Sequence, residues 1–303
     1  MMPSTKNRIT AIIVLLLLFF TGCNTTSHVY PDGDFKILVI SDIHITNSKS
    51  KDERLLKRIE KINNGKYPGV DFVVTTGDNV SSIYDHYYPD SLDKSYNRLE
   101  RFVEIMSRLK APKYFVLGNH EYKIDRERDS DAPYTKDEIV QLTKIWSDLT
   151  GFQPYYSFVH KGWKFIILNS MSGRYMNRFF DEDQLKWLEQ ELSDDLPTLL
   201  FFHHPLITDS FRIWCGLRGL MNVNIEPEFY MMLNKHKNQI KGIFVGHGHR
   251  WVHDKIFGTI EVYEAASFGD DESSPFYIVG FDNVTQTISV AQSPIEFVNT
   301  KVN

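Results

Sequence analysis

The sequence predicts an α/β protein in which two packed β-sheets are covered by helices. The first part of the chain alternates short apolar runs of strand type with amphipathic helical segments, a pattern typical of parallel sheets. From residue 155 onward the apolar runs follow one another more closely, which favours antiparallel pairing. No repeat, low-complexity tract or internal linker interrupts this region. We therefore expect one domain over residues 35–303.

The residues that precede this domain have the pattern of a processing segment. Two basic residues precede the apolar run 9–20, which at about 1.5 Å per residue is too short to cross a bilayer core of roughly 30 Å. A threonine and a glycine then precede Cys23. This pattern resembles a bacterial lipoprotein signal, with residues 1–22 removed and Cys23 lipidated. An ordinary signal peptide or an uncleaved anchor is the alternative.

The leader has consequences for location and partners. We expect an extracytoplasmic, membrane-anchored lipoprotein, with residues 23–34 as lipidated cysteine and polar tether. Removal of two basic residues changes the formal net charge from −5 to −7, so no basic surface favours nucleic acid as a partner. Cys215 is the only other cysteine, and an intramolecular disulfide cannot form once Cys23 is acylated.

Helical segments are predicted where apolar residues recur every three or four positions among charged ones. Thr135 with Glu138 three residues later forms a capping box, which marks the beginning of one of them. The predicted helices cover residues 52–63, 92–109, 135–149, 181–192 and 227–234.

Strands are predicted where short runs are rich in β-branched and aromatic residues. Lys161 and Gly162 separate two such runs and mark a hairpin. The predicted strands cover residues 35–40, 72–76, 114–117, 155–159, 163–168, 199–202, 243–245, 261–265, 276–281 and 287–290.

Five of these strands lead directly into residues that can bind metal ions. In α/β sheets, sites form at the carboxyl ends of strands. A single histidine or aspartate there could simply cap a turn, but five such strand ends in one chain indicate a common site. Imidazole and oxygen ligands without cysteine suit Zn, Mn or Fe. Seven ligands exceed the need of one ion, whereas two ions that share a carboxylate use them all. The candidates are Asp42, His44, Asp78, Asn119, His203, His247 and His249.

In order and spacing, these motifs resemble the calcineurin-like metallophosphoesterase superfamily over residues 35–250. The resemblance implies a four-layer αββα sandwich and a binuclear metal centre that hydrolyses phosphate esters. The matching motifs are Asp42-x-His44, Gly77-Asp78, Gly118-Asn119-His120-Glu121, His203 in His-His-Pro, and Gly246-His247-x-His249.

The resemblance also implies a role for each ligand, with Asp78 as the bridge between the ions. A hydroxide shared by the ions would attack phosphorus while His120 assists the leaving group. The alternative for His120 is a hydrogen-bonding residue beside the ligands. One ion would be bound by Asp42, His44, Asp78 and His249. The other would be bound by Asp78, Asn119, His203 and His247.

Residues next to the motifs are expected to support the ligands or contact the substrate, namely His204 and Glu121. Ser81 stands where many relatives carry an acidic or amide residue that orients the catalytic histidine, and where purple acid phosphatases carry a tyrosine ligand. Iron-tyrosinate chemistry is therefore not expected, and Glu121 or Ser82 could orient His120 instead. The other histidines are expected at the surface or in packing: His28, His86, His160, His236 and His253.

The Asp42-x-His44 pattern resembles phosphodiesterase-type members, which favours small diesters as substrates. One alternative is a phosphomonoesterase. Another is a lipoprotein that binds without turnover; that role predicts loss of ligands, whereas all seven are present. Three loops could select the substrate: residues 81–90, 122–133 and 206–226. The last contains aromatic residues that could stack a base or acyl group, and arginines that could hold a phosphate.

Overall fold

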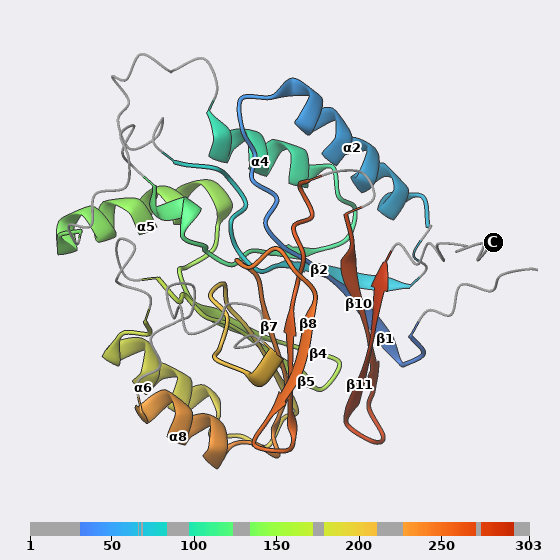
Figure 1. Ribbon diagram of the computed structural model, residues 1–303, viewed down its shortest axis with the longest axis vertical. Helices are drawn as coiled ribbons and strands as arrows, with labels where there is room; N and C mark the ends of the chain where they lie inside the picture. The colour runs from blue at the N-terminus through green and yellow to red at the C-terminus, as the bar shows by residue number, and fades with distance from the viewer. Residues whose placement is uncertain are drawn as a thin grey trace, which may run out of the picture. The chain divides into compact units, whose positions relative to one another are not determined.

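The strands of the chain form two mixed sheets with helices on their outer sides (Figure 1). The computed structural model describes residues 31–65, 67, 69–83, 97–123, 134–171, 179–210, 227–270 and 274–293. The chain divides into two units, residues 1–30 and 31–303, and all described residues belong to the second. The predicted architecture of two mixed sheets flanked by helices is confirmed. The predicted leader and Cys23 lie outside the described residues.

The first sheet has the strand order β11-β10-β1-β2-β3. β1, β2 and β3 are parallel to one another, whereas β10 pairs antiparallel with both β1 and β11. The last two strands of the chain therefore return to the sheet in which the domain begins. The strands are β1 (Phe35–Ile40), β2 (Val70–Thr75), β3 (Lys113–Tyr114), β10 (Phe276–Asp282) and β11 (Thr287–Ser293).

The second sheet has the strand order β4-β5-β6-β7-β9-β8. Its four central strands are parallel, and the two edge strands are antiparallel to their neighbours. The hairpin predicted at Lys161 and Gly162 is present, and both residues have the positive φ that a tight hairpin turn requires. β8 was not predicted. The strands are β4 (Tyr156–His160), β5 (Trp163–Ile167), β6 (Thr198–Phe201), β7 (Ile240–Val245), β8 (Val252–Ile256) and β9 (Ile260–Glu264).

Five helices among the described residues match the five predicted segments. They cover the outer sides of the sheets (Figure 1). The capping box of Thr135 and Glu138 is present, and the Asn97 side chain accepts a hydrogen bond from the N–H of Glu100. No helix in the described part is long and apolar enough to cross a membrane. The helices are α2 (Lys49–Asn63), α4 (Arg98–Ser107), α5 (Lys136–Thr150), α6 (Glu182–Glu191) and α8 (Pro227–Lys235).

Several predicted boundaries differ from the structure. β7 begins at Ile240 rather than at residue 243, α2 begins at Lys49 rather than at residue 52, and β11 continues to Ser293 rather than to residue 290. The helix predicted over residues 92–109 begins at Arg98, after its Asn97 cap; residues 92–96 lie outside the described part. The strand predicted over residues 114–117 is also shorter, because β3 ends at Tyr114.

Side-chain hydrogen bonds explain why the backbone pairing of β3 with β2 ends at Tyr114. The N–H of Phe115 donates to the hydroxyl of Tyr156 at 3.0 Å, and the N–H of Val116 donates to Oγ1 of Thr75 at 3.3 Å. Because these oxygens replace strand carbonyls as acceptors, the backbone leaves the sheet. The segment then enters a 3-10 turn, η1 (His120–Tyr122).

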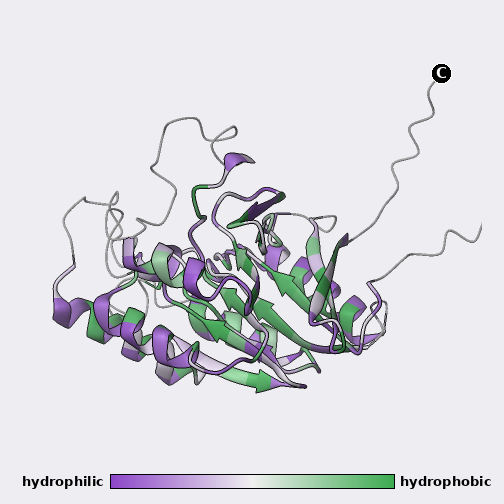
Figure 2. Cartoon of the chain, turned by 90° about the horizontal axis from the view of Figure 1, so that it is seen from below, coloured by the Kyte–Doolittle hydropathy of each residue, from purple (hydrophilic) through white to green (hydrophobic). Residues whose placement is uncertain are grey.

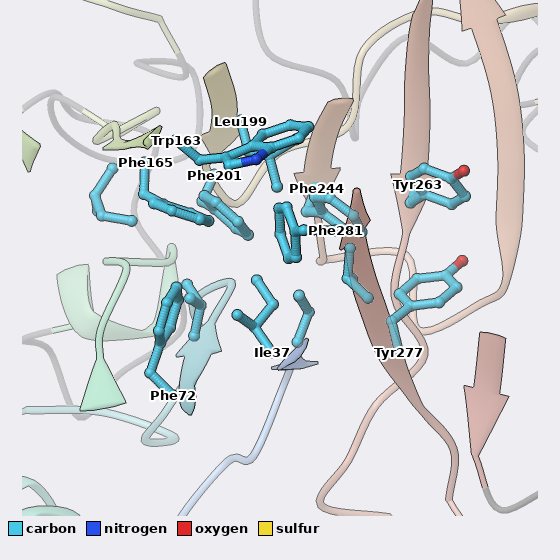
Figure 3. Packing of buried hydrophobic residues seen from close by; sticks show 14 of the residues in the cluster. Ile37, Phe72, Trp163, Phe165, Leu199, Phe201, Phe244, Tyr263, Tyr277 and Phe281 are labelled. Atoms are coloured by element: carbon cyan, nitrogen blue, oxygen red, sulfur yellow. The ribbon is translucent and has the colours of Figure 1, made fainter. Parts of the chain in front are cut away.

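Aromatic side chains fill the space between the two sheets. Figure 3 shows Phe165, Phe201 and Phe244 from the second sheet facing Phe281 from the first. The rings of Phe35 and Phe281 stack at 4.2 Å between their centres. Each buried ring contributes about 1.5–3 kcal/mol to folding. This core holds the ends of the central strands in fixed positions.

A second apolar cluster packs the outer face of the second sheet against α6 and α8. Leu188 of α6 and Leu233 of α8 are buried beside Leu200 and Ile243 of the sheet. Figure 2 shows hydrophobic residues along most of the strands, whereas the helices carry both hydrophilic and hydrophobic residues. Apolar packing on both faces of the second sheet thus holds the strand ends that the polar residues follow.

Candidate metal centre

The seven predicted ligands all lie at the carboxyl ends of strands and come together in one site. Four of the five strands involved, β1, β2, β6 and β7, are interior strands of their sheets. The site therefore spans the ends of both sheets. In chain order, β1, β2, β3, β6 and β7 lead to Asp42, His44, Asp78, Asn119, His203, His247 and His249.

The backbone at most of these residues has an uncommon conformation. Of the eight non-glycine residues with positive φ in the described part of the chain, three lie in hairpin turns. A positive φ costs a non-glycine residue roughly 1–2 kcal/mol. Such strain at successive strand ends is typical of functional sites, where the surrounding fold compensates for it. The other five residues are Asp42 (51°), His44 (49°), Asp78 (52°), His247 (73°) and His249 (55°).

One group of ligand atoms comes from Asp42, His44 and His249. Oδ1 of Asp42 lies 3.2 Å from Nε2 of His249 and 3.7 Å from Nε2 of His44. The two ring nitrogens lie 3.2 Å apart. The other carboxylate oxygen of Asp42 accepts hydrogen bonds from the Ser41 hydroxyl and the N–H of His247. This arrangement leaves Oδ1 aimed at the two imidazoles.

A second group comes from Asn119, His203 and His247. Oδ1 of Asn119 lies 3.0 Å from Nε2 of His203 and 2.9 Å from Nδ1 of His247. Nδ1 of His203 lies 2.8 Å from the carbonyl oxygen of Thr76. A carbonyl can only accept, so Nδ1 carries the proton in the neutral ring, and Nε2 offers its lone pair to the site.

Asp78 lies between the two groups. Its Oδ2 is 3.8 Å from Nε2 of His44 in the first group and 3.3 Å from Nε2 of His203 in the second. Its Oδ1 accepts a hydrogen bond from the N–H of His120 at 2.8 Å. One oxygen of Asp78 therefore faces both groups, while the other fixes the carboxylate.

The charges of the site are strongly coupled. Burial opposes ionisation of the two aspartates, but the histidine rings lower the pKa of Asp42 well below its usual range and also lower that of Asp78. Burial likewise opposes protonation of His203, but the Asp78 carboxylate raises its pKa to about 9. The buried carboxylates thus require positive charge nearby.

This donor set fits metal ions. Carboxylate, imidazole and amide donors converge from both sheets. The carboxylate and imidazole atoms form several groups in which every pair lies within 4.8 Å. Such mixed nitrogen and oxygen donors suit Zn, Mn or Fe. Bound cations would supply the positive charge that the protonated histidines otherwise provide.

His120 begins the 3-10 turn beside this site. Its Nε2 lies 3.8 Å from Oδ2 of Asp78, and its Nδ1 lies 3.0 Å from the carbonyl oxygen of Ser81. The sequence suggested Glu121 or Ser82 as the group that orients His120. The structure gives that contact to the Ser81 main chain, which residue types cannot reveal. Burial lowers the pKa of His120 to about 4.

Glu121 supports the ligand turns. Its carboxylate accepts hydrogen bonds from the N–H groups of Asp78 (3.1 Å), Val80 (3.0 Å) and Gly118 (2.6 Å). Burial, together with the charge of Asp78, raises the pKa of Glu121 to about 7. Because the side chain is fully buried, it holds two loops together rather than facing solvent.

His204 is also fully buried. Its Nδ1 lies 3.0 Å from the Ser170 hydroxyl, which accepts the N–H groups of His203 and His204. Its ring centre lies 4.7 Å from that of His247. The burial favours support of the ligand rings over contact with a substrate.

The other histidines of the described part lie at the surface or in packing, as expected. His160 contacts Asp71 and the rings of Phe35 and Phe72. His236 hydrogen-bonds Gln239, and His253 hydrogen-bonds Glu261. The predicted positions His28 and His86, and most of the three predicted substrate loops, lie outside the described residues.

Glu264, which ends β9 beside the site, was not among the residues predicted from the sequence. It is almost fully buried, and burial together with the charge of Asp42 raises its pKa to about 8. A hydrogen bond from the main chain of Gly248, the residue between His247 and His249, opposes this shift. A carboxylate at the end of an apolar strand was the available signal, because the predicted ligands share this placement.

Known proteins with similar sequences agree with this chemistry. A probable cyclic nucleotide phosphodiesterase of a Synechococcus strain is 29% identical over 164 residues, which cover 53% of this chain and 54% of that protein. Purple acid phosphatase 4 of Arabidopsis thaliana is 28% identical over 279 residues, 89% of this chain and 68% of that protein. A 3′,5′-cyclic adenosine monophosphate phosphodiesterase of Vibrio vulnificus is 24% identical over 237 residues, 75% and 74% of the two chains.

The fold is shared with a solved structure. A dimetal phosphatase from Danio rerio superposes with a TM-score of 0.60 at 14% identity, covering 83% of this chain and 94% of that one. The chain spans about half the length of the Synechococcus relative. The family model of the calcineurin-like phosphoesterases matches residues 35–251. The chain therefore belongs to the calcineurin-like phosphoesterase family.

Proposed function

We propose that the protein hydrolyses small phosphodiesters at a centre of two metal ions. The observation that carries this proposal is the position of Asp78 Oδ2, which faces both groups of donor atoms. The names of two relatives, both phosphodiesterases of cyclic nucleotides, support diesters as the substrate class. A cyclic nucleotide is therefore the first natural substrate to test.

In this proposal the ions are Mn, Fe or Zn. Such ions lower the pKa of water and offset the charge of phosphoryl oxygens. Asp78 would contact both ions. The first ion would be held by Asp42, His44, Asp78 and His249. The second would be held by Asp78, Asn119, His203 and His247.

The protein's own contribution at the leaving side is His120. Its Nε2 points toward Asp78 Oδ2, while its Nδ1 faces the Ser81 carbonyl. In this proposal the contact holds the ring plane, and Nε2 lies on the side of Asp78 from which His120 would assist the leaving group. Glu121 and His204 would keep the ligand turns in place, because both are buried against them.

The enzyme should be tested as the soluble chain from residue 24. After chelation, hydrolysis of bis-p-nitrophenyl phosphate should return when Mn, Zn or Fe is added. Asp78→Asn should abolish it, while Asp195→Asn, an exposed control, should retain it. Wild-type protein that binds no metal would refute the proposed centre.

Phosphomonoester hydrolysis is the second candidate. It is favoured by the similarity to purple acid phosphatase 4 and by the fold shared with a dimetal phosphatase. Comparison of p-nitrophenyl phosphate with bis-p-nitrophenyl phosphate separates the two. A higher kcat/KM for the monoester would replace the diester proposal.

We also propose that residues 1–22 are a signal peptide, that Cys23 carries a lipid anchor outside the cytoplasm, and that residues 35–303 are one domain. The support is the pattern of basic residues, apolar run and cysteine. Full-length protein should incorporate labelled fatty acid and sediment with membranes. Cys23→Ala should lose both properties, whereas the matched control Cys215→Ala should keep them. Equal labelling of both variants would contradict the anchor.

A further inference from the structure

We infer that the ammonium group of Lys123 belongs to the active site, where it donates a hydrogen bond to the oxygen that leaves phosphorus. This inference rests on the proposed function and adds a cation that neither the motifs nor the ligand groups include. It follows from the contact between Lys123 and His120 and from the hydrogen-bonding capacity of each atom there.

The local backbone places the two side chains together. A 3-10 turn has three residues per turn, so positions i and i+3 lie one above the other. His120 begins η1, and Lys123 directly follows its end. Nζ of Lys123 lies 2.9 Å from Nε2 of His120, which is a hydrogen-bond distance.

The main chain of Lys123 is held in place. Its N–H donates to the carbonyl oxygen of His120 at 3.1 Å. Its carbonyl oxygen accepts hydrogen bonds from the Ser82 hydroxyl at 2.8 Å and from the N–H of Ile83 at 3.2 Å. The ammonium therefore extends from an anchored backbone, a condition for a preorganised donor.

The atoms of this contact determine which group donates. The Ser81 carbonyl can only accept, so Nδ1 of His120 is the protonated nitrogen of the neutral ring. An ammonium has donors and no acceptor, so Nε2 of His120 accepts from Lys123. Lys123 therefore adds N–H donors beside His120.

The pair of His120 and Lys123 lies beside the metal ligands. Nε2 of His120 lies 3.8 Å from Oδ2 of Asp78, the oxygen between the two ligand groups. Lys123 lies within one hydrogen bond of that nitrogen. A phosphoryl group bound over Asp78 would bring its leaving oxygen close to His120 and Lys123. The Lys123 ammonium could then donate its hydrogen bond to that oxygen instead of to Nε2 of His120. Negative charge develops there as the ester bond breaks, and a fixed cation stabilises it.

The test uses the metal-loaded enzyme and bis-aryl phosphates whose leaving phenols range from p-nitrophenol to unsubstituted phenol. Loss of one preorganised donor costs about 10²–10³ in kcat, and a poorer leaving group depends more on that donor. Lys123→Met should therefore lower kcat by about 100-fold for the phenyl diester but by less than about tenfold for the p-nitrophenyl diester. Lys123→Arg should restore most of the loss, because it keeps a cation.

Controls separate the possible failures. Lys110→Met removes an exposed lysine and should leave every rate unchanged. Metal content should be the same in wild type and Lys123→Met. A loss that is equal for all leaving groups, or no loss, would overturn the role of Lys123 while leaving the proposed function in place. A metal-loaded wild type that cleaves none of the diesters would overturn the proposed function itself, and the role of Lys123 with it.

Discussion

The carboxylate of Glu121 accepts a hydrogen bond from the main-chain N–H of Asp78 at 3.1 Å. The same carboxylate accepts the N–H groups of Gly118 and Val80. A side chain that has no ligand atom in either group thus positions the residue that faces both. The turn after β2 and the turn after β3 are joined through this one buried group.

Glu121→Gln should weaken metal binding. In the wild type, both carboxylate oxygens of Glu121 accept main-chain N–H groups. In glutamine, an amide NH₂ group replaces one of these oxygens; it can only donate, so it would leave at least one of these N–H groups without an acceptor. We expect metal affinity to fall by about 10–100-fold and the free energy of unfolding by roughly 1–3 kcal/mol. Metal titration and denaturant unfolding measure the two effects. Glu228→Gln, at an exposed glutamate, is the matched control, and equal behaviour of the two variants would contradict the role of Glu121.

Asp78→Asn and Asp42→Asn should differ in metal stoichiometry. Asp78 Oδ2 lies within 4 Å of a histidine of each group, whereas the contacts of Asp42 Oδ1 at 3.2 Å and 3.7 Å are with the histidines of the first. Elemental analysis should therefore find one ion retained by Asp42→Asn, and loss of both from Asp78→Asn under the same dialysis. Retention of a single ion by Asp78→Asn would indicate that it does not join the two groups.

Gly118→Ala should disrupt the site. A Cβ at Gly118 would lie 2.3 Å from both the main-chain nitrogen and Oδ1 of Asp78. We expect loss of metal and activity. Gly258 is the control, because it has φ of 75° but open space around its Cβ position. Gly258→Ala should cost about 1 kcal/mol through backbone strain and retain activity. An active Gly118→Ala enzyme would show that this turn adapts.

Asp71 should make stability depend on acid pH. Burial opposes its ionisation, but Lys161 and His160 lower its pKa in the folded protein, linking β2 of the first sheet to the hairpin of the second. The unfolded chain then binds more protons, so this contribution is present above the unfolded pKa of about 3.9 and is lost as the pH falls through the folded pKa.

Denaturant unfolding between about pH 6 and pH 3 measures this contribution. The free energy of unfolding of wild type should fall more steeply than that of Asp71→Asn. Parallel curves would show that the contacts of Asp71 with His160 and Lys161 add no stability in this range.

The predicted ligands came from a local signal. An apolar strand followed at once by acidic, amide or imidazole residues occurs five times, and each occurrence is readable within a few neighbouring residues. Parallel strands end at the same edge of a sheet, so the residues that follow these strands are also predicted to lie close together. For the same reason the hairpin at Lys161 and the capping box at Thr135 were predictable.

Other features depend on residues that are far apart in the chain. The return of β10 and β11 to the first sheet, and the shortening of β3 by the hydroxyls of Tyr156 and Thr75, follow from packing of distant segments. The contact of His120 with the Ser81 carbonyl involves the main chain, which residue types do not specify.

The sequence by itself predicted the family, the candidate ligand types and their order, because these are properties of short segments. Only the tertiary structure decided which oxygen of Asp78 faces both groups, and that Glu264 and Lys123 lie beside the site. Those relationships are set by side-chain directions and by distances of a few ångströms, which the packing of the two sheets determines.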